Sequence, residues 1–87
     1  MKIVSTSKFN KSYKTRIEGN KKLEKRFENR IKLFRENPLN PVLRLHRLKG
    51  NKANYYSFSI TGDIRAIIKM ERDIVTFYDI GAHSQVY

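Results

Sequence analysis

The chain has 87 residues, no cysteine, and 19 Lys and Arg against 8 Asp and Glu, which gives a formal net charge of +11. A chain of this length can bury only one modest core, so we expect a single domain spanning residues 1–87. The absence of cysteine excludes a disulfide framework and a thiolate zinc site. Because no apolar run reaches the length of a signal peptide or a membrane span, we expect a soluble, cytoplasmic protein with no membrane partner.

The positive charge is concentrated in the first part of the sequence. Residues 1–52 carry 16 basic and 4 acidic side chains, a net charge of +12, whereas residues 53–87 carry 3 and 4, a net charge of −1. A field of this sign attracts polyanions, so nucleic acid is the favoured class of partner. Two simpler explanations stay open: charged helix faces that keep a small domain soluble, and an acidic protein partner.

Two amphipathic helices are predicted in the N-terminal half. A short strand over residues 2–5 precedes Thr6 and Ser7, which are candidate N-caps of the first helix. A break at residues 19–20 separates this helix from a longer one, which ends just before Pro38. We expect the two segments to form an antiparallel helical hairpin. Their apolar residues recur at the helical period; they are Phe9, Tyr13, Ile17, Leu23, Phe27, Ile31 and Phe34.

From residue 55 onward the apolar period changes to two, which is typical of strands with one buried face. Residues 61–63 have the composition of a three-residue hairpin loop, which would pair Ser59 with Arg65. This register leaves Ser57, Ser59 and Arg65 together on an open polar face. The opposite face would receive the helices and consists of Tyr56, Phe58, Ile60, Ile64, Ala66 and Ile68.

A last strand is predicted over residues 74–80, after a turn at residues 71–73. Its register stays open, because a two-residue loop and a three-residue loop put Phe77 on opposite faces of the sheet. The expected fold class is therefore α+β, with a short N-terminal strand and an antiparallel helical hairpin packed on one face of a small, mainly antiparallel sheet.

Four runs of residues carry a resemblance to a known family. They are His46-Arg47-Leu48-Lys49-Gly50, Tyr55 to Phe58, Thr61-Gly62-Asp63-Ile64-Arg65 and Asp79 to Tyr87. In order and spacing, the chain resembles the RelE/YafQ toxins of bacterial type II toxin-antitoxin systems, within the RelE/ParE superfamily. The C-terminal half contains the family's patterns H-x-L-x-G, D-x-R and G-x-H-x-x-x-[YF], whereas the helical half matches only in layout.

The resemblance implies a RelE-like fold and an mRNA interferase, that is, an endoribonuclease toxin that inhibits translation. Such toxins cut mRNA by attack of a ribose 2′-hydroxyl on the adjacent phosphate, without a metal or other cofactor and usually on the ribosome. The implied partners are the ribosome, mRNA and a cognate antitoxin protein, for which we expect an acidic, helical segment.

This reaction needs a base, an acid and a cation for the charge on phosphorus. By position, His83 matches the family's C-terminal catalytic histidine and is assigned as general acid, with general base as the reverse option. His46 is the candidate for the second proton transfer or for orienting the phosphate, and Arg65 for neutralising the scissile phosphate. Asp63 could orient a histidine or act as base, although Asp after Gly is also ordinary hairpin chemistry.

The remaining candidates concern RNA binding. Tyr87 matches the family's terminal aromatic residue, which would stack on a base or position it. RelE itself has lysines on the first sheet strand where this chain has serines. The residues expected to contact RNA are Arg47, Lys49, Lys52, Ser57 and Ser59.

Two other function classes remain open for a chain of this kind. ParE-type proteins resemble these toxins but inhibit gyrase without catalysis, and a basic RNA-binding module would also fit the charge. The ParE-type proteins lack the set formed by His46, Arg65 and His83, so the presence of this set favours the nuclease.

Overall fold

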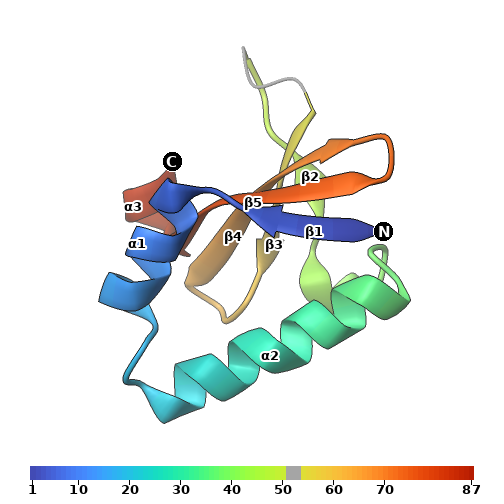
Figure 1. The fold of residues 1–87 in the computed structure, drawn as a ribbon. Helices are drawn as coiled ribbons and strands as arrows, with labels where there is room; N and C mark the ends of the chain where they lie inside the picture. Colours follow the sequence, from blue (N-terminus) through green and yellow to red (C-terminus); the bar gives the residue numbers. More distant parts are fainter. Residues whose placement is uncertain (51–53) are drawn as a thin grey trace.

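The structure is a computed structural model that describes residues 1–50 and 54–87 (Figure 1). Its five strands form one sheet in the order β1-β5-β4-β3-β2. Strand β1 pairs with β5 in parallel, and the other pairings are antiparallel. The α+β fold class predicted from the sequence is confirmed. The elements in chain order are β1 (Lys2–Ser5), α1 (Ser7–Arg16), α2 (Lys21–Glu36), the 3-10 helix η1 (Pro41–Leu43), β2 (His46–Arg47), β3 (Tyr55–Ser59), β4 (Ile64–Glu71), β5 (Ile74–Ala82) and α3 (His83–Val86).

Side-chain caps fix where the two long helices begin. The Thr6 side chain accepts a hydrogen bond from the backbone N–H of Phe9 at 3.0 Å, and Asn20 does the same for Leu23 at 3.2 Å. Such caps satisfy N–H groups that have no partner within the helix. Helix α2 ends before Pro38, as predicted. In the part of the chain that is described, no helix is long and apolar enough to cross a membrane.

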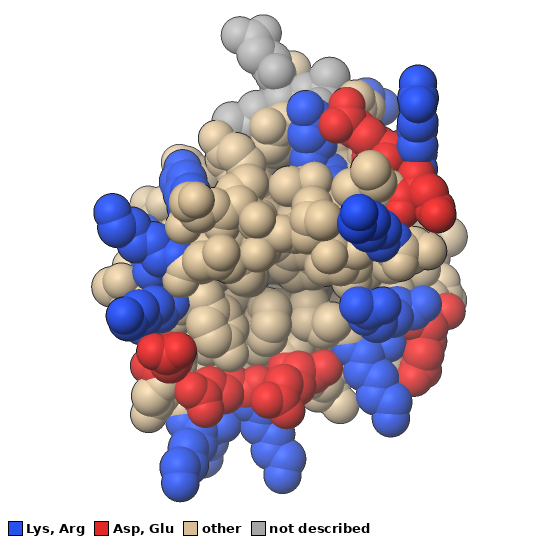
Figure 2. Space-filling model, viewed as in Figure 1, with Lys and Arg blue, Asp and Glu red and all other residues tan. Residues whose placement is uncertain are grey.

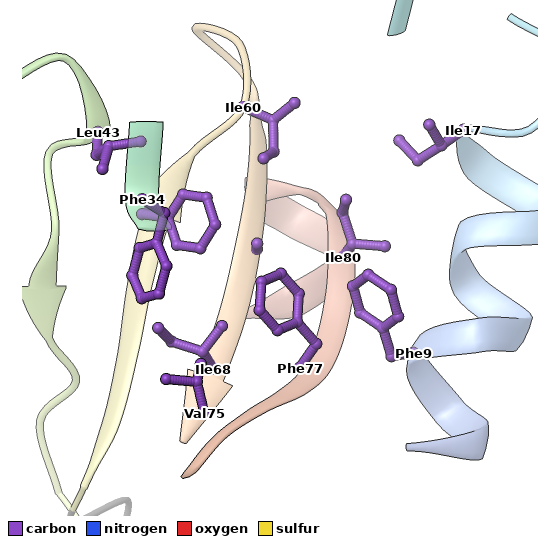
Figure 3. Packing of buried hydrophobic residues seen from close by; sticks show 11 residues of the cluster. Phe9, Ile17, Phe34, Leu43, Ile60, Ile68, Val75, Phe77 and Ile80 are labelled. Atoms are coloured by element: carbon purple, nitrogen blue, oxygen red, sulfur yellow. The ribbon is translucent and has the colours of Figure 1, made fainter. Parts of the chain in front are cut away.

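The hydrophobic core lies between the sheet and the helical segments (Figure 3). The rings of Phe34 in α2 and Phe58 in β3 stack at a centroid distance of 5.0 Å. Helix α1 packs against β5, where Phe9 meets Phe77 edge to face at 5.4 Å. The two helices touch each other through aromatic rings, including those of Tyr13 and Phe27. The buried cluster comprises Phe9, Ile17, Phe34, Leu43, Phe58, Ile60, Ala66, Ile68, Val75, Phe77 and Ile80.

The predicted register of the hairpin between β3 and β4 is confirmed, since Ser59 pairs with Arg65 and Ser57 with Ile67. The open question about the next hairpin is also resolved. Glu71 pairs with Ile74, which leaves a two-residue loop and places Phe77 in the core. A β-bulge then follows between Ile67 and Ile68 in the pairing with β5.

The prediction of an open polar face on β3 is wrong. A short strand, β2, pairs with β3 and places His46 opposite Ser57, so β3 is not the edge of the sheet. Ser57 is flanked by His46 on one side and Ile67 on the other and is fully buried, while Ser59 is 5% exposed. The sequence predicts no strand at His46, whereas the structure places this residue in the edge strand β2.

Candidate active site

Most of the predicted site residues line one shallow pocket at the end of the sheet. Its volume is about 310 Å³. The side chains come from β2 and the segment after it, from β4, and from α3 and the C-terminal residue, so the fold brings together segments that are far apart in the sequence. The lining residues are His46, Arg47, Leu48, Lys49, Arg65, His83 and Tyr87.

Strand β2 fixes the position of His46. Its backbone pairs with Ser57, and one residue further on Leu48 donates a backbone hydrogen bond to Tyr55 at 2.9 Å. The Nδ1 atom of His46 lies 3.2 Å from the carbonyl oxygen of Arg44, a contact that assigns the hydrogen of a neutral ring to Nδ1. In that tautomer Nε2 carries the lone pair and can accept a proton.

Arg65 stands between two neighbours that leave it space. Its partner across β3 is Ser59, and its partner across β5 is Gly81, which has no side chain. The Nη1 atom of Arg65 donates a hydrogen bond to the Ser59 hydroxyl. This bond uses one of about five N–H donors of a guanidinium, so the planar fork is oriented while donors remain for a ligand.

His83 and Tyr87 belong to the single helical turn at the C-terminus. Their rings lie 4.4 Å apart, and the backbone N–H of Tyr87 donates to the carbonyl of His83 at 3.1 Å. The Gln85 side chain accepts from the backbone N–H of Ala82 at 2.7 Å, which holds the start of the turn. Both rings are exposed to solvent and open toward the pocket.

A charged cluster that the sequence did not predict lies under this turn. Asp79 is only 4% exposed, and it accepts a hydrogen bond from the backbone N–H of Ile80 at 2.8 Å. Its carboxylate is 3.5 Å from Arg16 and 3.7 Å from Lys8, both in α1. Arg16 also donates to the carbonyl of Ile80 at 2.8 Å. Helix α1 is thereby tied to the end of β5, directly before His83.

Gly81 leaves the space that the Arg16 and Gln85 side chains occupy in this arrangement. A Cβ atom at this position would lie 2.6 Å from Nη1 of Arg16 and 2.8 Å from Oε1 of Gln85, both closer than van der Waals contact. The family pattern G-x-H therefore has a local physical reason here, because the glycine lets Arg16 cross the chain. Arg16 and Asp79 carried no distinguishing signal in the sequence, and only the folded chain brings Asp79 within ion-pair distance of Arg16 and Lys8.

Some predicted site residues do not join the pocket. Asp63 is exposed in the hairpin loop, where its backbone N–H donates to Thr61 at 3.2 Å, as in ordinary turn chemistry. Ser57 is buried beneath the surface, and Ser59 reaches the site only through Arg65. Lys52 lies outside the described residues.

Among the described residues, the pocket lining combines two arginines, one lysine and two histidines with no acidic side chain. The acidic residues lie elsewhere. Figure 2 shows acidic side chains gathered over α2 on the face that is in view, with basic side chains around its margins. The positive charge is therefore unevenly distributed, and the composition of the pocket suits a polyanion.

The fold is that of known bacterial toxins. The chain superimposes on the crystal structure of YafQ from E. coli strain BL21(DE3) with a TM-score of 0.79 and 20% identity, covering 98% of this chain and 96% of that chain. The YoeB/ParE toxin from Agrobacterium tumefaciens gives a TM-score of 0.80 at 20% identity, covering 95% and 99%. YafQ in the E. coli DinJ-YafQ toxin-antitoxin complex gives 0.80 at 20% identity, covering 98% and 94%.

The sequence itself identifies the family. The family model described as "Bacterial toxin of type II toxin-antitoxin system, YafQ" matches residues 1–87. No curated protein sequence matches the chain. The chain therefore belongs to the YafQ family of type II toxins, which confirms the resemblance seen in its motifs.

Proposed function

We propose that this toxin is an endoribonuclease that cuts mRNA on the ribosome. The observation that carries the proposal is the convergence of His46, Arg65 and His83 in one basic pocket, although they come from β2, β4 and α3. A proton acceptor, a proton donor and a permanent cation are what phosphodiester cleavage by a neighbouring hydroxyl requires, and two imidazole rings and a guanidinium can fill these roles.

In the proposed reaction the 2′-hydroxyl loses its proton to a base and its oxygen attacks the adjacent phosphorus. The bond from phosphorus to the 5′-oxygen then breaks, and that oxygen takes a proton from the acid. The products are a 2′,3′-cyclic phosphate and a free 5′-hydroxyl. We assign His83 as the acid and His46 as the base, since the Nδ1 contact of His46 leaves Nε2 as acceptor; the reverse assignment gives the same products. Arg65 stabilises the charge on the phosphorane oxygens.

The other lining residues would hold the RNA strand. Tyr87 is 45% exposed and packs on His83, so its ring can stack on a base next to the scissile bond. Arg47 and Lys49 are exposed on the opposite wall, where they can bind backbone phosphates. We assign no role in catalysis to Asp63, because it does not line the pocket.

A toxin of this kind needs a protein that restrains it. The E. coli relative was crystallised as a DinJ-YafQ toxin-antitoxin complex. We propose a cognate antitoxin for this chain as well, with an acidic segment that complements its charge of +11. The expected result is a stable complex with the product of the adjacent gene in gel filtration, formed in the cytoplasm where mRNA and ribosomes are found.

Cleavage can be mapped by primer extension in a reconstituted translation reaction. Wild-type protein should produce cuts within the mRNA, and the double substitution His83→Ala with Arg65→Ala should abolish them. A non-catalytic toxin, such as a gyrase inhibitor, predicts no cuts and predicts that His83→Ala leaves toxicity unchanged. Either result would refute the nuclease assignment.

A further inference from the structure

A second basic pocket lies beside the candidate active site. Its volume is about 400 Å³, and in the described structure no acidic side chain lines it. Two arginines from different elements face it, Arg30 from α2 and Arg44 from the end of η1. The remaining lining residues are Pro41, Val42, Ser59, Thr61 and Gly62.

Two residues connect this pocket with the active site. Ser59 lines the second pocket, and its hydroxyl binds Nη1 of Arg65 in the first. Arg44 lines the second pocket with its side chain, while its carbonyl oxygen contacts Nδ1 of His46 at 3.2 Å. The two pockets therefore share a wall, and a strand bound at Arg65 can continue into the second pocket.

The two arginines are positioned without a protein anion. Nε of Arg30 donates to the carbonyl of Ile60 at 3.2 Å, which holds the guanidinium at the pocket. In the described chain neither Arg30 nor Arg44 forms an ion pair with an acidic side chain. Burial, and then the neighbouring charge of Arg26, lower the pKa of Arg30 below its ordinary value. An anion in the pocket would offset both effects.

The backbone at Arg44 supports a dedicated role for this residue. Its φ is +50°, a left-handed conformation that residues other than glycine and asparagine rarely adopt. The turn is held by a hydrogen bond from Arg44 N–H to the carbonyl of Pro41 at 3.2 Å. In this conformation the carbonyl of Arg44 contacts His46 while the side chain of the same residue lines the second pocket.

We propose that the second pocket is a subsite for a backbone phosphate of single-stranded RNA, next to the nucleotide that is cut. The proposal rests on the proposed nuclease function and adds where the substrate strand runs. Arg30 and Arg44 bind the phosphate, and the hydroxyls of Ser59 and Thr61 lie in the same lining as hydrogen-bonding groups. The recognition is of the backbone and carries no sequence preference.

The test measures binding separately from cleavage. The probe is a short fluorescent single-stranded RNA with 2′-O-methyl groups, which cannot be cut, titrated with the full-length toxin over a range of salt concentrations. Each phosphate that is neutralised on a single strand contributes about 0.7 to the slope of log K against log salt. Because Arg30 and Arg44 bind the same phosphate, Arg30→Gln combined with Arg44→Asn should reduce the slope by about 0.7; asparagine is chosen because it tolerates the left-handed backbone.

Two matched variants separate the subsite from general charge and from folding. Lys22→Gln with Lys25→Gln removes the same charge from exposed positions of α2 that line a different hollow, and should leave the slope unchanged. Arg30→Lys loses the contact of Nε with Ile60 but keeps the charge, and should retain the slope. Equal losses in the two double variants, or no binding by wild type, would overturn the subsite.

Other outcomes distinguish the subsite from the nuclease proposal. If the Arg30 and Arg44 variant shows the reduced salt dependence of RNA binding while wild type fails to cut mRNA on ribosomes, the phosphate subsite stands and the nuclease assignment fails. If wild type cuts mRNA and the Arg30 and Arg44 variant binds the probe as well as wild type, the subsite is wrong. Weakened antitoxin binding with unchanged RNA binding would assign the pocket to the protein partner instead, which also overturns the proposal.

Discussion

The buried carboxylate of Asp79 should stabilise both the fold and the position of the C-terminal turn that carries His83. Asp79→Asn keeps an oxygen for the N–H of Ile80 but removes the negative charge that faces Arg16 at 3.5 Å and Lys8 at 3.7 Å. Each partly exposed ion pair contributes about 0.5 kcal/mol. Weakening a charge-assisted hydrogen bond to a neutral one costs about 1 kcal/mol more. The expected loss in free energy of unfolding is about 2 kcal/mol.

Urea and thermal denaturation followed by circular dichroism measure this loss. In a domain of this size about 1 kcal/mol shifts the midpoint by about 4 to 8 °C, so a decrease of about 8 to 16 °C is expected. Asp73→Asn is the matched control. It removes the same charge from a side chain that is 90% exposed and 3.5 Å from the N-terminal amine, and it should leave the midpoint within error of wild type. Equal effects of the two substitutions would refute the assigned role of Asp79.

Three further substitutions test other parts of the structure. The Ser57 hydroxyl is buried without a hydrogen-bond partner among the described residues, so Ser57→Ala should raise the free energy of unfolding by about 1 kcal/mol in urea denaturation; a loss of stability would show that the hydroxyl is satisfied. Burial, and then nearby glutamates, raise the pKa of Tyr13 above its usual 10.0. The stability that the neutral Tyr13 side chain contributes is therefore fully present below pH 10 and is lost as the pH rises through the pKa of Tyr13 in the folded state. Tyr13→Phe should reduce the fall in the free energy of unfolding that is measured as the pH rises above 10. An unchanged fall would show that Tyr13 is not its source. Gly81→Ala should displace Arg16 and Gln85, lowering kcat for mRNA cleavage with little change in KM; an equal fall in binding of uncut RNA would contradict a positioning effect.

The central hairpin and the helices were predictable because local rules determine them. The pairing of Ser59 with Arg65 follows from a short loop and alternating apolar residues. A register shifted by one residue in either direction would have buried Arg65. The first helix begins at Thr6 because its hydroxyl can accept the Phe9 N–H, a preference that can be read directly from the sequence. These features depend on residues close together along the chain.

Other features depend on pairing between distant segments and were not predicted. Strand β2 has only His46 and Arg47, too short to show a period, yet it changes the environment of Ser57 from exposed to buried. The bulge in β5 puts Phe77 and Ile80 on the same face although they are three residues apart, which breaks the alternation. The family motifs nevertheless predicted which residues lie together in the pocket, because proteins that share these motifs share the fold that pairs the distant segments.

The location of the site was more predictable than the charges that support it. His46, Arg65, His83 and Tyr87 were recognisable by their spacing, and the structure places all four in one pocket. Asp63 matched a motif equally well but lies exposed in the hairpin loop, where its backbone N–H donates to the Thr61 hydroxyl. Basic residues such as Arg30 are numerous in this sequence, so only three-dimensional packing distinguishes those that face a pocket.

The most direct test of the proposed chemistry places a single 2′-deoxynucleotide in an mRNA bound to programmed ribosomes. The substitution is made at the nucleotide whose 2′-hydroxyl would attack, at a site that wild-type toxin cuts in the unmodified message. If the 2′-hydroxyl is the nucleophile, cleavage at that bond should disappear, and the unmodified message should yield a 2′,3′-cyclic phosphate end. Cleavage that persists at the deoxy position would contradict the assignment of His46, Arg65 and His83 to this reaction.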